Sequence, residues 1–503
     1  MKLQELLTGA GIDCPQNKRD IDIQNISSSS KRIFEGGMFV CLCGLHTDGH
    51  SYIEDARRRG ARIIIAQRGK LPSDNCADDI IFTDNTRAAL SRLLAVFYGK
   101  PQMSMKIIGV TGTNGKTTTA RMLYEILKKW GKRCGYIGTV GSIAPSGRLD
   151  IVSDNICANM TTPDPEELYK ILSVMKNDTV EYLVMEVSSH SLYLQKVAPI
   201  EFEYGLFTNL TEDHLDFHND MESYYLAKKK LFDISKRAII NIDDMYGRRI
   251  AGEIDSPIRV SADGREAQYS AYEIKYNGYS GLEYKLYSRI ANLRVRTSIP
   301  GRFTVYNSLM AIACAIEIGV PASVIRYAML EMKGTDGRLE RVELPTSADF
   351  SVFIDYAHTP DALENLLKCA ISFKKKKNRI VLLFGCGGDR DRDKRKIMGR
   401  IATSLADVTV ITSDNPRGED REKIIFDILL GVDKESNFRV IPDRREAIRH
   451  VIMSARVGDI ILLAGKGHEN YEIVGECKKY FNEREIVISA YLERAGIGDT
   501  QSK

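Results

Sequence analysis

The sequence lacks three features that would place it in other classes of protein. No run approaches the ~18 consecutive apolar residues that a membrane-spanning helix needs, so no membrane partner is expected. The 71 Lys and Arg residues against 67 Asp and Glu leave a net charge of +4, too small an excess in 503 residues to suggest a nucleic-acid partner. The ten cysteines are scattered without a CxxC pair, which argues against a structural zinc site and indicates a reducing compartment.

The start of the chain and its composition indicate a cytoplasmic globular protein. Residues 1–14, MKLQELLTGAGIDC, lack the long apolar core of a signal peptide. The chain is 43% hydrophobic and 27% charged, which is ordinary for globular proteins. At roughly 100 to 200 residues per domain, this length predicts about three domains. We expect small-molecule partners and a monomer.

The pattern of apolar runs predicts an α/β fold of three domains, with boundaries at 1–100, 101–333 and 334–503. The first has short apolar runs around a helical stretch, typical of a small α/β module. In the second, strands alternate with helical stretches, which implies a parallel sheet flanked by helices. The third has four further strand-like runs and fits a Rossmann-like domain. The expected strands are at 38–42, 62–66, 106–110, 182–187, 204–208, 238–241, 352–356, 379–384, 408–413 and 459–464.

The strongest motif lies between an apolar stretch and the helical stretch at 117–130. Glycines let backbone N–H groups approach phosphate oxygens, and the following helix N-terminus adds partial positive charge. Lys116 would reach the outer phosphates, and the Thr117 hydroxyl can bind Mg²⁺. The generic spacing GxxxxGK[ST] would place glycine at Val110, so the loop departs from it at one position. We expect the phosphates of a nucleotide, ATP if the remaining motifs agree, to bind at Gly112, Thr113, Asn114, Gly115, Lys116, Thr117 and Thr118.

Two other apolar stretches deliver polar residues at their carboxyl ends, where α/β sheets place ligands. The first ends near Glu186, a natural magnesium ligand, and the second leads to His214 and His218. The spacing of the two histidines could mimic a zinc pair, but oxygen-rich surroundings without cysteine favour Mg²⁺. We expect His214 to belong to the site and His218 to be a solvated loop histidine. No NKxD-type base-reading motif follows a strand, which argues against a GTPase.

These motifs together resemble the Mur ligase family, the ATP-dependent amide ligases of peptidoglycan precursor synthesis. The resembling stretches are GTNGKTT at 112–118, MEVSSH at 185–190, TNLTEDHLDFH at 208–218 and YYLAKKKLF at 224–232. The resemblance implies that Lys228 reacts with CO₂ to become a carbamate, N6-carboxylysine, which can bind a cation as a carboxylate does. It implies Mg²⁺ held by Thr117, Glu186, His214 and Lys228.

The C-terminal half extends the resemblance through VYNS at 305–308, GRLE at 337–340, DYAHTP at 355–360 and GCGGDR at 385–390. In such ligases Asn307, Asp355 and His358 are expected around ATP. Arg338 would counter the charge that develops as the γ-phosphate moves. The implied catalytic residues are Lys116, Glu186, His214, Lys228 and Arg338.

The motif Ser413-Asp414-Asn415-Pro416-Arg417 resembles the amino-acid recognition motif of members that add meso-diaminopimelate. Diaminopimelate carries a second carboxylate where lysine carries only hydrogen. Arg417 offers a planar fork that can hold this carboxylate. The simpler interpretation of Arg417 is a surface salt-bridge arginine. The implied residues around the incoming amino acid are Arg390, Asp414, Asn415, Pro416, Arg417, Gly465 and Glu469.

The resemblance is looser where the UDP-muramoyl dipeptide is expected. Ser30 keeps its place, but Ser29 and Lys31 stand where the family commonly has Asp and Arg, and Lys196 stands where it has Arg. Lysine still attracts an anion but lacks the bidentate geometry of arginine. The implied residues are Ser30, Leu45, His46, Thr47, Asn159, Thr161, Thr162, Ser188 and Lys196.

The activity implied by the resemblance is addition of meso-diaminopimelate to UDP-N-acetylmuramoyl-L-alanyl-D-glutamate through an acyl phosphate. One alternative within the family is addition of lysine or another amine. A second alternative is a P-loop regulatory or binding protein without turnover. The presence of the full catalytic set argues against this second alternative, because a binder has no chemical need for it.

Overall fold

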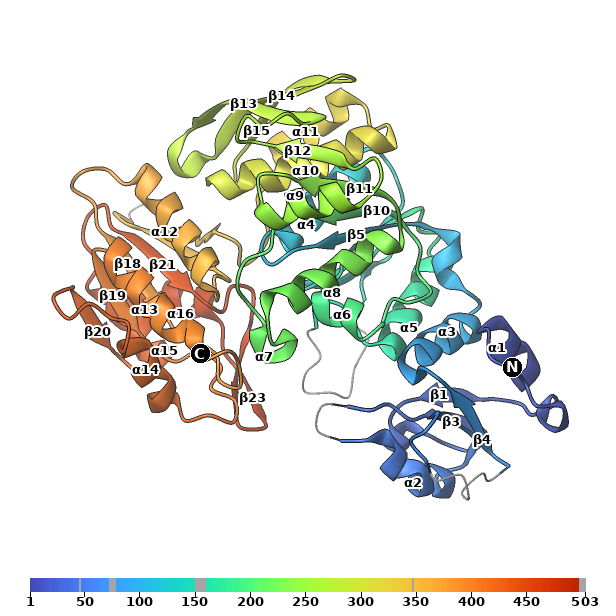
Figure 1. The fold of residues 1–503 in the computed structure, drawn as a ribbon. Helices are drawn as coiled ribbons and strands as arrows, with labels where there is room; N and C mark the ends of the chain where they lie inside the picture. The colour runs from blue at the N-terminus through green and yellow to red at the C-terminus, as the bar shows by residue number, and fades with distance from the viewer. Residues whose placement is uncertain (45–46, 72–77, 150–159, 346–347, 497–503) are drawn as a thin grey trace. The chain divides into compact units, whose positions relative to one another are not determined.

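The computed structural model describes residues 1–44, 47–71, 78–149, 160–345 and 348–496 (Figure 1). The chain forms two compact units. The first contains Met1–Thr111, Gly131–Gly205 and Ala227–Arg237, and the second contains Gly112–Trp130, Leu206–Leu226 and Ala238–Lys503. Three elements, β10 (Phe202–Phe207), α8 (Met221–Asp233) and β11 (Ser235–Asn241), include residues of both units. The predicted domain boundaries at 100 and 333 stay predictions.

The first unit begins with a four-stranded parallel sheet in the order β1-β2-β3-β4. The strand β3 is rich in isoleucine, and such β-branched side chains favour strands. Ile64 and Ala66 of β3 pack with Phe39 and Cys41 in one core. The elements are α1 (Leu3–Gly9), β1 (Asn25–Ser27), β2 (Gly37–Val40), α2 (Ile53–Arg58), β3 (Ala61–Gln67), β4 (Ile80–Thr83) and α3 (Thr86–Phe97).

The first unit also contains a second run of strands, in the order β5-β9-β6-β7-β8. The strands β5, β9 and β6 are parallel, whereas β7 and β8 are antiparallel additions. Every residue of β6 and β9 is buried, as expected for a parallel strand covered on both faces. The elements are β5 (Lys106–Thr111), β6 (Cys134–Gly138), β7 (Gly141–Ala144), β8 (Gly147–Arg148), α5 (Pro165–Asn177), β9 (Tyr182–Glu186) and α6 (Ser189–Tyr193).

In the second unit, β11 to β15 lie side by side in numerical order. The pairs β11–β12 and β12–β13 are parallel, whereas β13, β14 and β15 are antiparallel. Helix α4 packs against α10, a helix that is apolar on most of its faces. The elements are α4 (Lys116–Lys129), α7 (Leu215–His218), α9 (Met245–Glu253), β12 (Ile258–Ser261), β13 (Tyr269–Tyr276), β14 (Leu282–Ser288), β15 (Asn292–Thr297), α10 (Arg302–Ile318) and α11 (Ala322–Glu331).

The C-terminal part of the second unit is a six-stranded sheet in the order β16-β17-β21-β18-β19-β20. All its pairs are parallel except β16–β17. One core packs α12, α13 and α14 on the sheet, and a separate core packs α15 and α16, so that helices cover both faces (Figure 1). The strands are β16 (Glu340–Arg341), β17 (Ser351–Asp355), β18 (Ile380–Phe384), β19 (Val408–Ile411), β20 (Phe438–Val440) and β21 (Ile460–Ala464). The remaining elements are α12 (Pro360–Phe373), α13 (Asp393–Leu405), α14 (Arg421–Leu429), α15 (Arg444–Met453), the hairpin β22 (Tyr471–Val474) and β23 (Cys477–Tyr480), and α16 (Glu483–Arg494).

The predicted α/β class is confirmed, and each apolar run predicted as a strand overlaps one. The parallel pairing predicted over 101–333 is confirmed for β5, β9 and β6 and for β11, β12 and β13, and antiparallel strands are added to it at β7, β8, β14 and β15. The strands β14 and β15 alternate buried residues with more exposed ones, which suits antiparallel strands with one face in solvent. The short β7 and β8 are antiparallel because tight turns connect them directly.

Candidate functional site

The glycine-rich loop ends at the N-terminus of α4, and its two glycines are required by the backbone. Gly112 has φ +150° and Gly115 has φ +83°, conformations that L side chains rarely adopt. A Cβ at Gly112 would overlap Thr208 Oγ1, and a Cβ at Gly115 would overlap Asn307 Oδ1. Only glycine therefore allows the loop to pack this closely on its neighbours.

The segment after β10 braces this loop. The Asn209 carbonyl accepts from the Thr113 N–H, and Asn209 Oδ1 accepts from the Asn114 N–H, both at 2.9 Å. Thr208 Oγ1 donates to the Asn114 carbonyl at 2.6 Å. Asn114 Nδ2 donates to Asp361 Oδ2, in the first turn of α12, at 2.7 Å. The loop conformation is thus fixed by named hydrogen bonds rather than by glycine alone.

Three predicted ATP-site side chains gather at this loop. Lys116 Nζ donates to the carbonyls of Gly112 and Thr113, each at 2.9 Å. Arg338 Nη2 donates to Thr117 Oγ1 at 3.2 Å, across 221 residues of sequence. The structure therefore brings Lys116, Thr117 and Arg338 together, as the sequence predicted for one phosphate site.

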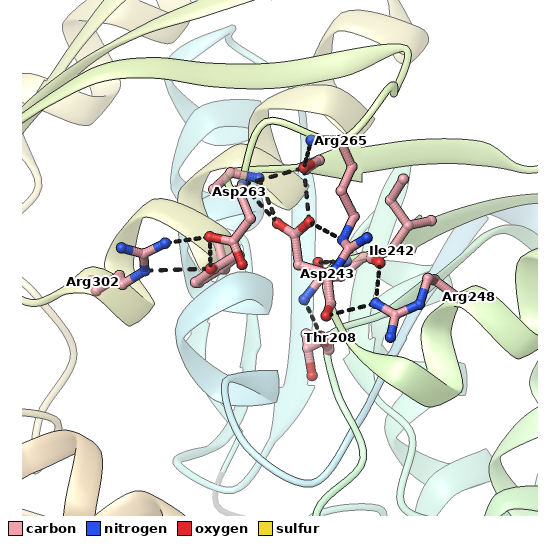
Figure 2. Close-up of polar contacts among 11 residues, drawn as sticks. Thr208, Ile242, Asp243, Arg248, Asp263, Arg265 and Arg302 are labelled. Atoms are coloured by element: carbon pink, nitrogen blue, oxygen red, sulfur yellow. Dashed lines mark hydrogen bonds and ion pairs between the residues drawn. The ribbon is translucent and has the colours of Figure 1, made fainter.

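Helix α10 carries Asn307 to the same loop, and its first turn is anchored by polar contacts. Thr119 Oγ1 donates to Asn307 Oδ1 at 3.4 Å. At the beginning of α10, Arg302 forms an ion pair with Asp263, and the Tyr306 hydroxyl donates to the same carboxylate at 2.8 Å (Figure 2). These contacts fix where α10 begins and hence where Asn307 lies.

The loop that supplies Asp263 is itself held by the buried carboxylate of Asp243, which follows β11 (Figure 2). Asp243 accepts from the Ser261 hydroxyl at 2.8 Å and from the N–H groups of Ala262 and Asp263 at 2.6 and 3.1 Å. Arg265 Nε lies 3.5 Å from the same carboxylate. Because the buried charge is fully engaged, this network is a rigid support for the nearby ATP-site helix.

Asp355 ends β17 and His358 follows it, at the carboxyl edge of the C-terminal sheet. Asp355 accepts from the Leu339 N–H at 2.6 Å and the Ala357 N–H at 2.8 Å, and burial raises the pKa of its carboxyl. His358 Nδ1 lies 2.7 Å from the Tyr356 carbonyl, which can only accept, so Nδ1 carries the hydrogen. Burial lowers the pKa of His358 to about 4, so the ring is neutral and Nε2 can accept a hydrogen bond.

Glu186 lies at the end of β9 with a fully buried side chain. Its Oε1 accepts from the Tyr136 hydroxyl at 2.6 Å and from the Thr139 N–H at 3.0 Å. Its Oε2 accepts from Thr139 Oγ1 at 3.0 Å. The carboxylate is therefore oriented by donors of the β6 segment, which sequence reasoning did not single out.

His214 and its neighbours belong to the second unit. His214 has φ +55° and a partly exposed ring, with Nε2 3.4 Å from Asp213 Oδ2. Burial alone would raise the pKa of Asp213, but His214 and Lys394 hold it well below its usual value. Lys394 Nζ lies 3.7 Å from Asp213 Oδ1. The prediction that His218 is a solvated loop histidine was wrong, because it is buried in α7 with its ring stacked on Tyr224.

Lys228, on α8, is 1% exposed. The carbamate expected on Lys228 stays a prediction. Glu186 and Lys228 belong to the first unit, and Thr117 and His214 belong to the second. Oxygen donors with a single imidazole are a donor set that fits Mg²⁺.

Four side chains, those of Asp414, Asn415, Lys466 and Glu469, form a buried polar cluster at the predicted amino-acid site. Lys466 Nζ donates to Asn415 Oδ1 and to the Tyr471 carbonyl, both at 2.9 Å. It also lies 3.7 Å from Asp414 Oδ1 and 4.0 Å from Glu469 Oε2. Asn415 Nδ2 donates to Glu469 Oε2 at 2.7 Å. Burial and the charge of Asp414 raise the pKa of Glu469 to about 7.

Arg417 lies beside this cluster in a strained backbone conformation. Its φ is +51°, its N–H donates to the Ile473 carbonyl at 3.1 Å, and Nη1 donates to the Gly388 carbonyl at 2.8 Å. No ion pair of Arg417 occurs among the described residues, so the alternative of a surface salt-bridge arginine finds no partner there. Arg390 is exposed and contacts only the Asp389 carbonyl by hydrogen bond, within the described ranges. The Pro416 carbonyl lies close to Gly388, and Gly465 lies close to Asp414 Oδ2 of the cluster.

The predicted UDP-side residues lie in the first unit. Ser30 is buried, and its hydroxyl hydrogen-bonds Asp55. Beside it, Glu166 Oε1 accepts from the Ser28 N–H at 2.8 Å and the Ser28 hydroxyl at 2.9 Å, and Glu166 Oε2 accepts from the Ser27 hydroxyl at 3.0 Å. Arg32 Nη1 lies 3.3 Å from the same carboxylate. The Thr47 carbonyl accepts a hydrogen bond from the Gly44 N–H at 2.9 Å. The predicted residues Leu45, His46 and Asn159 lie outside the described residues.

A second group of these residues surrounds the end of β9. Thr162 Oγ1 donates to the Glu186 carbonyl at 2.9 Å and accepts from the Ser188 N–H at 3.0 Å. Thr161 Oγ1 lies 3.1 Å from Thr139 Oγ1. Lys196 is buried with Nζ 2.7 Å from Asp164 Oδ1, so its charge is already balanced by an acid of this chain.

One cysteine-containing cluster of potential metal ligands, Cys43, Asp48 and His50, occurs among the described residues. His50 Nε2 accepts from the Gln67 N–H at 3.0 Å, which requires Nδ1 to carry the hydrogen of the neutral ring. Nδ1 then donates to Asp48 Oδ1. Both ring nitrogens are thus used, so the cluster is structural.

The first unit also has a cavity of about 900 Å³ away from these residues. It is lined by the amino ends of strands, including Lys106 and Tyr182, and by Arg92 of α3. Glu186 lies at the opposite, carboxyl end of β9. The cavity is therefore not the predicted site, and its lysines are partly balanced, for example Lys132 by Glu181 at 3.1 Å.

Three family descriptions match successive parts of the chain. The "Mur ligase family, catalytic domain" matches residues 22–98, the "Mur ligase middle domain" matches 110–315, and the "Mur ligase, glutamate ligase domain" matches 337–467. These matches confirm the predicted three-domain architecture. No helix in the described part of the chain combines the length and apolarity required to span a bilayer.

Similar proteins share the whole length of the chain. It is 40% identical to the UDP-N-acetylmuramoyl-L-alanyl-D-glutamate–2,6-diaminopimelate ligase 1 of Clostridium acetobutylicum, over 97% of this chain and 98% of the relative. The corresponding ligase of Syntrophomonas wolfei is also 40% identical, with the same coverage. A solved structure of a UDP-N-acetylmuramoyl-L-alanyl-D-glutamate–2,6-diaminopimelate ligase superposes with a TM-score of 0.66 at 29% identity, covering 98% of this chain and 99% of that one. The chain belongs to the Mur ligase family of ATP-dependent amide-forming enzymes.

Proposed function

We propose that the protein joins meso-2,6-diaminopimelate to the D-glutamate γ-carboxylate of UDP-N-acetylmuramoyl-L-alanyl-D-glutamate in peptidoglycan precursor synthesis. The observation that supports this most directly is Arg417 beside the buried cluster of Asp414, Asn415, Lys466 and Glu469. Such a cluster offers an arginine for a carboxylate and an acid for an ammonium. Full-length similarity to ligases named for this reaction supports the same conclusion.

The reaction forms an amide at the expense of ATP. The γ-carboxylate attacks the γ-phosphate, giving an acyl phosphate and ADP. The neutral amine of diaminopimelate then attacks the acyl carbon, and phosphate leaves as the amide forms. Lys116 and Arg338 offset the charge on the moving phosphoryl group, and Asn307, Asp355 and His358 position the nucleotide.

Mg²⁺ fits the donors Thr117, Glu186, His214 and carbamylated Lys228, and when bound it supplies charge stabilisation at the phosphates. The remaining assignments are for the substrates. Ser30, Thr47, Thr161, Thr162, Ser188 and Lys196 face the UDP-muramoyl dipeptide, and Arg390, Asp414, Asn415, Pro416, Arg417, Gly465 and Glu469 face diaminopimelate. We further propose a cytoplasmic monomer, in keeping with its nucleotide-linked substrate.

Phosphate release from ATP tests the proposal. Purified protein is given the UDP-muramoyl dipeptide with meso-diaminopimelate or L-lysine in parallel, and the product is identified by mass. Turnover with diaminopimelate alone is expected. Turnover with lysine instead would keep the family but overturn the role of Arg417, and no turnover with either amine would favour another acceptor or a binding protein.

A further inference from the structure

We propose that Tyr136 and Thr139 are positioning residues that set the orientation of the Glu186 carboxylate for a divalent cation. This inference rests on the proposed role of Glu186 as a magnesium ligand. Both residues come from the carboxyl end of β6, which lies parallel to β9 with Tyr136 opposite Val184. Neither residue contributes an expected metal ligand.

Three hydrogen bonds from two residues fix the carboxylate in rotation as well as position. The Tyr136 hydroxyl and the Thr139 N–H converge on Oε1 at 2.6 and 3.0 Å, and Thr139 Oγ1 binds Oε2 at 3.0 Å. Tyr136 and Glu186 are both fully buried, so these bonds act where water does not compete. Outer-shell donors of this kind orient a carboxylate ligand before the cation binds.

Gly138 provides the space that this arrangement needs. A Cβ at Gly138 would overlap both Glu186 Oε1 and the Tyr136 hydroxyl oxygen. The φ of Gly138 is not in the left-handed region, so the backbone conformation itself does not call for glycine. The requirement is therefore steric and specific to the carboxylate and its phenol donor.

The same residues connect the carboxylate to the segment expected to hold the muramoyl peptide. Thr139 Oγ1 lies 3.1 Å from Thr161 Oγ1, and Thr162 Oγ1 donates to the Glu186 carbonyl at 2.9 Å. Thr139 thus contacts both the proposed metal ligand and the proposed substrate segment. A change at Thr139 is expected to alter cation binding and dipeptide KM together, whereas a change at Tyr136 acts on the cation.

Mn²⁺ binding to the full-length protein with ADP, measured by electron paramagnetic resonance of free Mn²⁺, tests the proposal. Tyr136→Phe is expected to weaken Mn²⁺ binding about tenfold, the lower end for loss of an outer-shell partner. Gly138→Ala should do the same by displacing the carboxylate without removing a donor. Tyr169→Phe is the matched control, because the Tyr169 hydroxyl is buried and has no hydrogen-bond partner in the described structure.

The thermal unfolding midpoint separates positioning from general stability. If Tyr136→Phe lowers only this midpoint and binds Mn²⁺ as Tyr169→Phe does, while Glu186→Gln loses Mn²⁺, the positioning role is wrong. If Glu186→Gln itself binds Mn²⁺ normally, the proposed metal role of Glu186 fails, and the positioning role fails with it. Weaker Mn²⁺ binding in both Tyr136→Phe and Gly138→Ala, with Tyr169→Phe unchanged, supports the proposal.

Discussion

Lys466 donates to Asn415 Oδ1 at 2.9 Å, and this contact turns the Asn415 amide nitrogen toward Glu469, which it reaches at 2.7 Å. Together with the Ile473 N–H, which donates to the same oxygen at 3.0 Å, the buried lysine sets which end of the amide faces the acid. The hydrogen-bonded chain from Lys466 through the Asn415 amide to Glu469 exists only in the folded protein. An ammonium group that enters this site therefore encounters Glu469, and whether the two can pair depends on the protonation state of Glu469.

Diaminopimelate binding is expected to strengthen as the pH rises through about 7. Burial, and then Asp414, raise the pKa of Glu469 from 4.5 to about 7, so below that pH the carboxyl is protonated and cannot pair with an ammonium. Calorimetry should give a Kd roughly tenfold weaker at pH 6 than at pH 8. In Glu469→Gln the Kd should not depend on pH over this range.

The same raised pKa has a consequence for stability. Between pH 4.5 and about 7 the folded protein holds a proton that the unfolded chain has lost, so the contribution of Glu469 to stability falls as the pH rises through this window. The unfolding midpoint of Glu469→Gln minus that of the original protein should therefore increase from pH 5 to pH 8. An unchanged difference between the two would contradict the raised pKa.

Arg417→Met is expected to reduce selectivity for diaminopimelate over lysine. Loss of hydrogen bonds to a carboxylate costs about 1.5–3 kcal/mol, which corresponds to roughly a 10- to 100-fold loss in kcat/KM for diaminopimelate. The kcat/KM for lysine should change little, because lysine lacks that carboxylate. Arg439→Met, at an exposed position on β20, is the control. Equal losses for both amines would show that Arg417 does not read the second carboxylate.

Gly115→Ala should abolish tight nucleotide binding. Its φ is +83°, and the added Cβ would overlap Asn307 Oδ1, so the loop or Asn307 must move. We expect ADP affinity to fall at least about tenfold, as measured by calorimetry. Gly131→Ala is a matched control with φ +79° and nothing within 4 Å of the new Cβ. It should cost about 1 kcal/mol of stability and leave the Kd for ADP unchanged.

Lys228→Ala should lower activity about 100-fold, because a carboxylate-like metal ligand would be lost. A short-chain carboxylate added to the assay should restore part of this activity by taking the place of the carbamate. Lys229→Ala, one residue along α8, is the control and should respond to neither change. Full activity of Lys228→Ala without any addition would count against the carbamate.

The buried pair of Asp213 and Lys394 is expected to contribute strongly to the free energy of unfolding. Their atoms are 3.7 Å apart, and their side chains are 5% and 8% exposed. Lys394→Met should destabilise the protein by about 3 kcal/mol, because it removes a buried counter-charge of Asp213 and leaves only His214 beside it, and adding Asp213→Asn should recover at least about 1 kcal/mol. Urea unfolding measures both. Lys368→Met, which breaks the exposed pair with Glu364, should cost less than about 0.5 kcal/mol.

Sequence reasoning found the residues that occur in motifs at the ends of strands. The glycine-rich loop, Glu186 and Asp355 all lie at carboxyl ends of strands because parallel α/β sheets present their loops there. The order of the motifs along the chain is also enough to indicate the family. The apolar runs alone were enough to predict the strands that carry these motifs.

The sequence could not identify residues whose environment depends on packing. The sequence does not distinguish Lys394 and Lys466 from surface lysines, yet they are 7% and 0% exposed, and an acid distant in sequence lies beside each. Tyr136 belongs to none of the motifs, and its partner Glu186 is 50 residues away. His218 was misjudged for the same reason, since only the fold stacks it on Tyr224.

Glu166 connects parts of the chain that match different family descriptions. It lies in α5, within the middle-domain match, yet it binds Ser27, Ser28 and Arg32, within the N-terminal match. In a fragment ending at residue 100, the hydrogen-bond donors of Ser27 and Ser28 would lose the Glu166 carboxylate as their acceptor. Exchange of the N-terminal module between related enzymes therefore requires the recipient to supply an acid at this position, so the module is not independently transplantable.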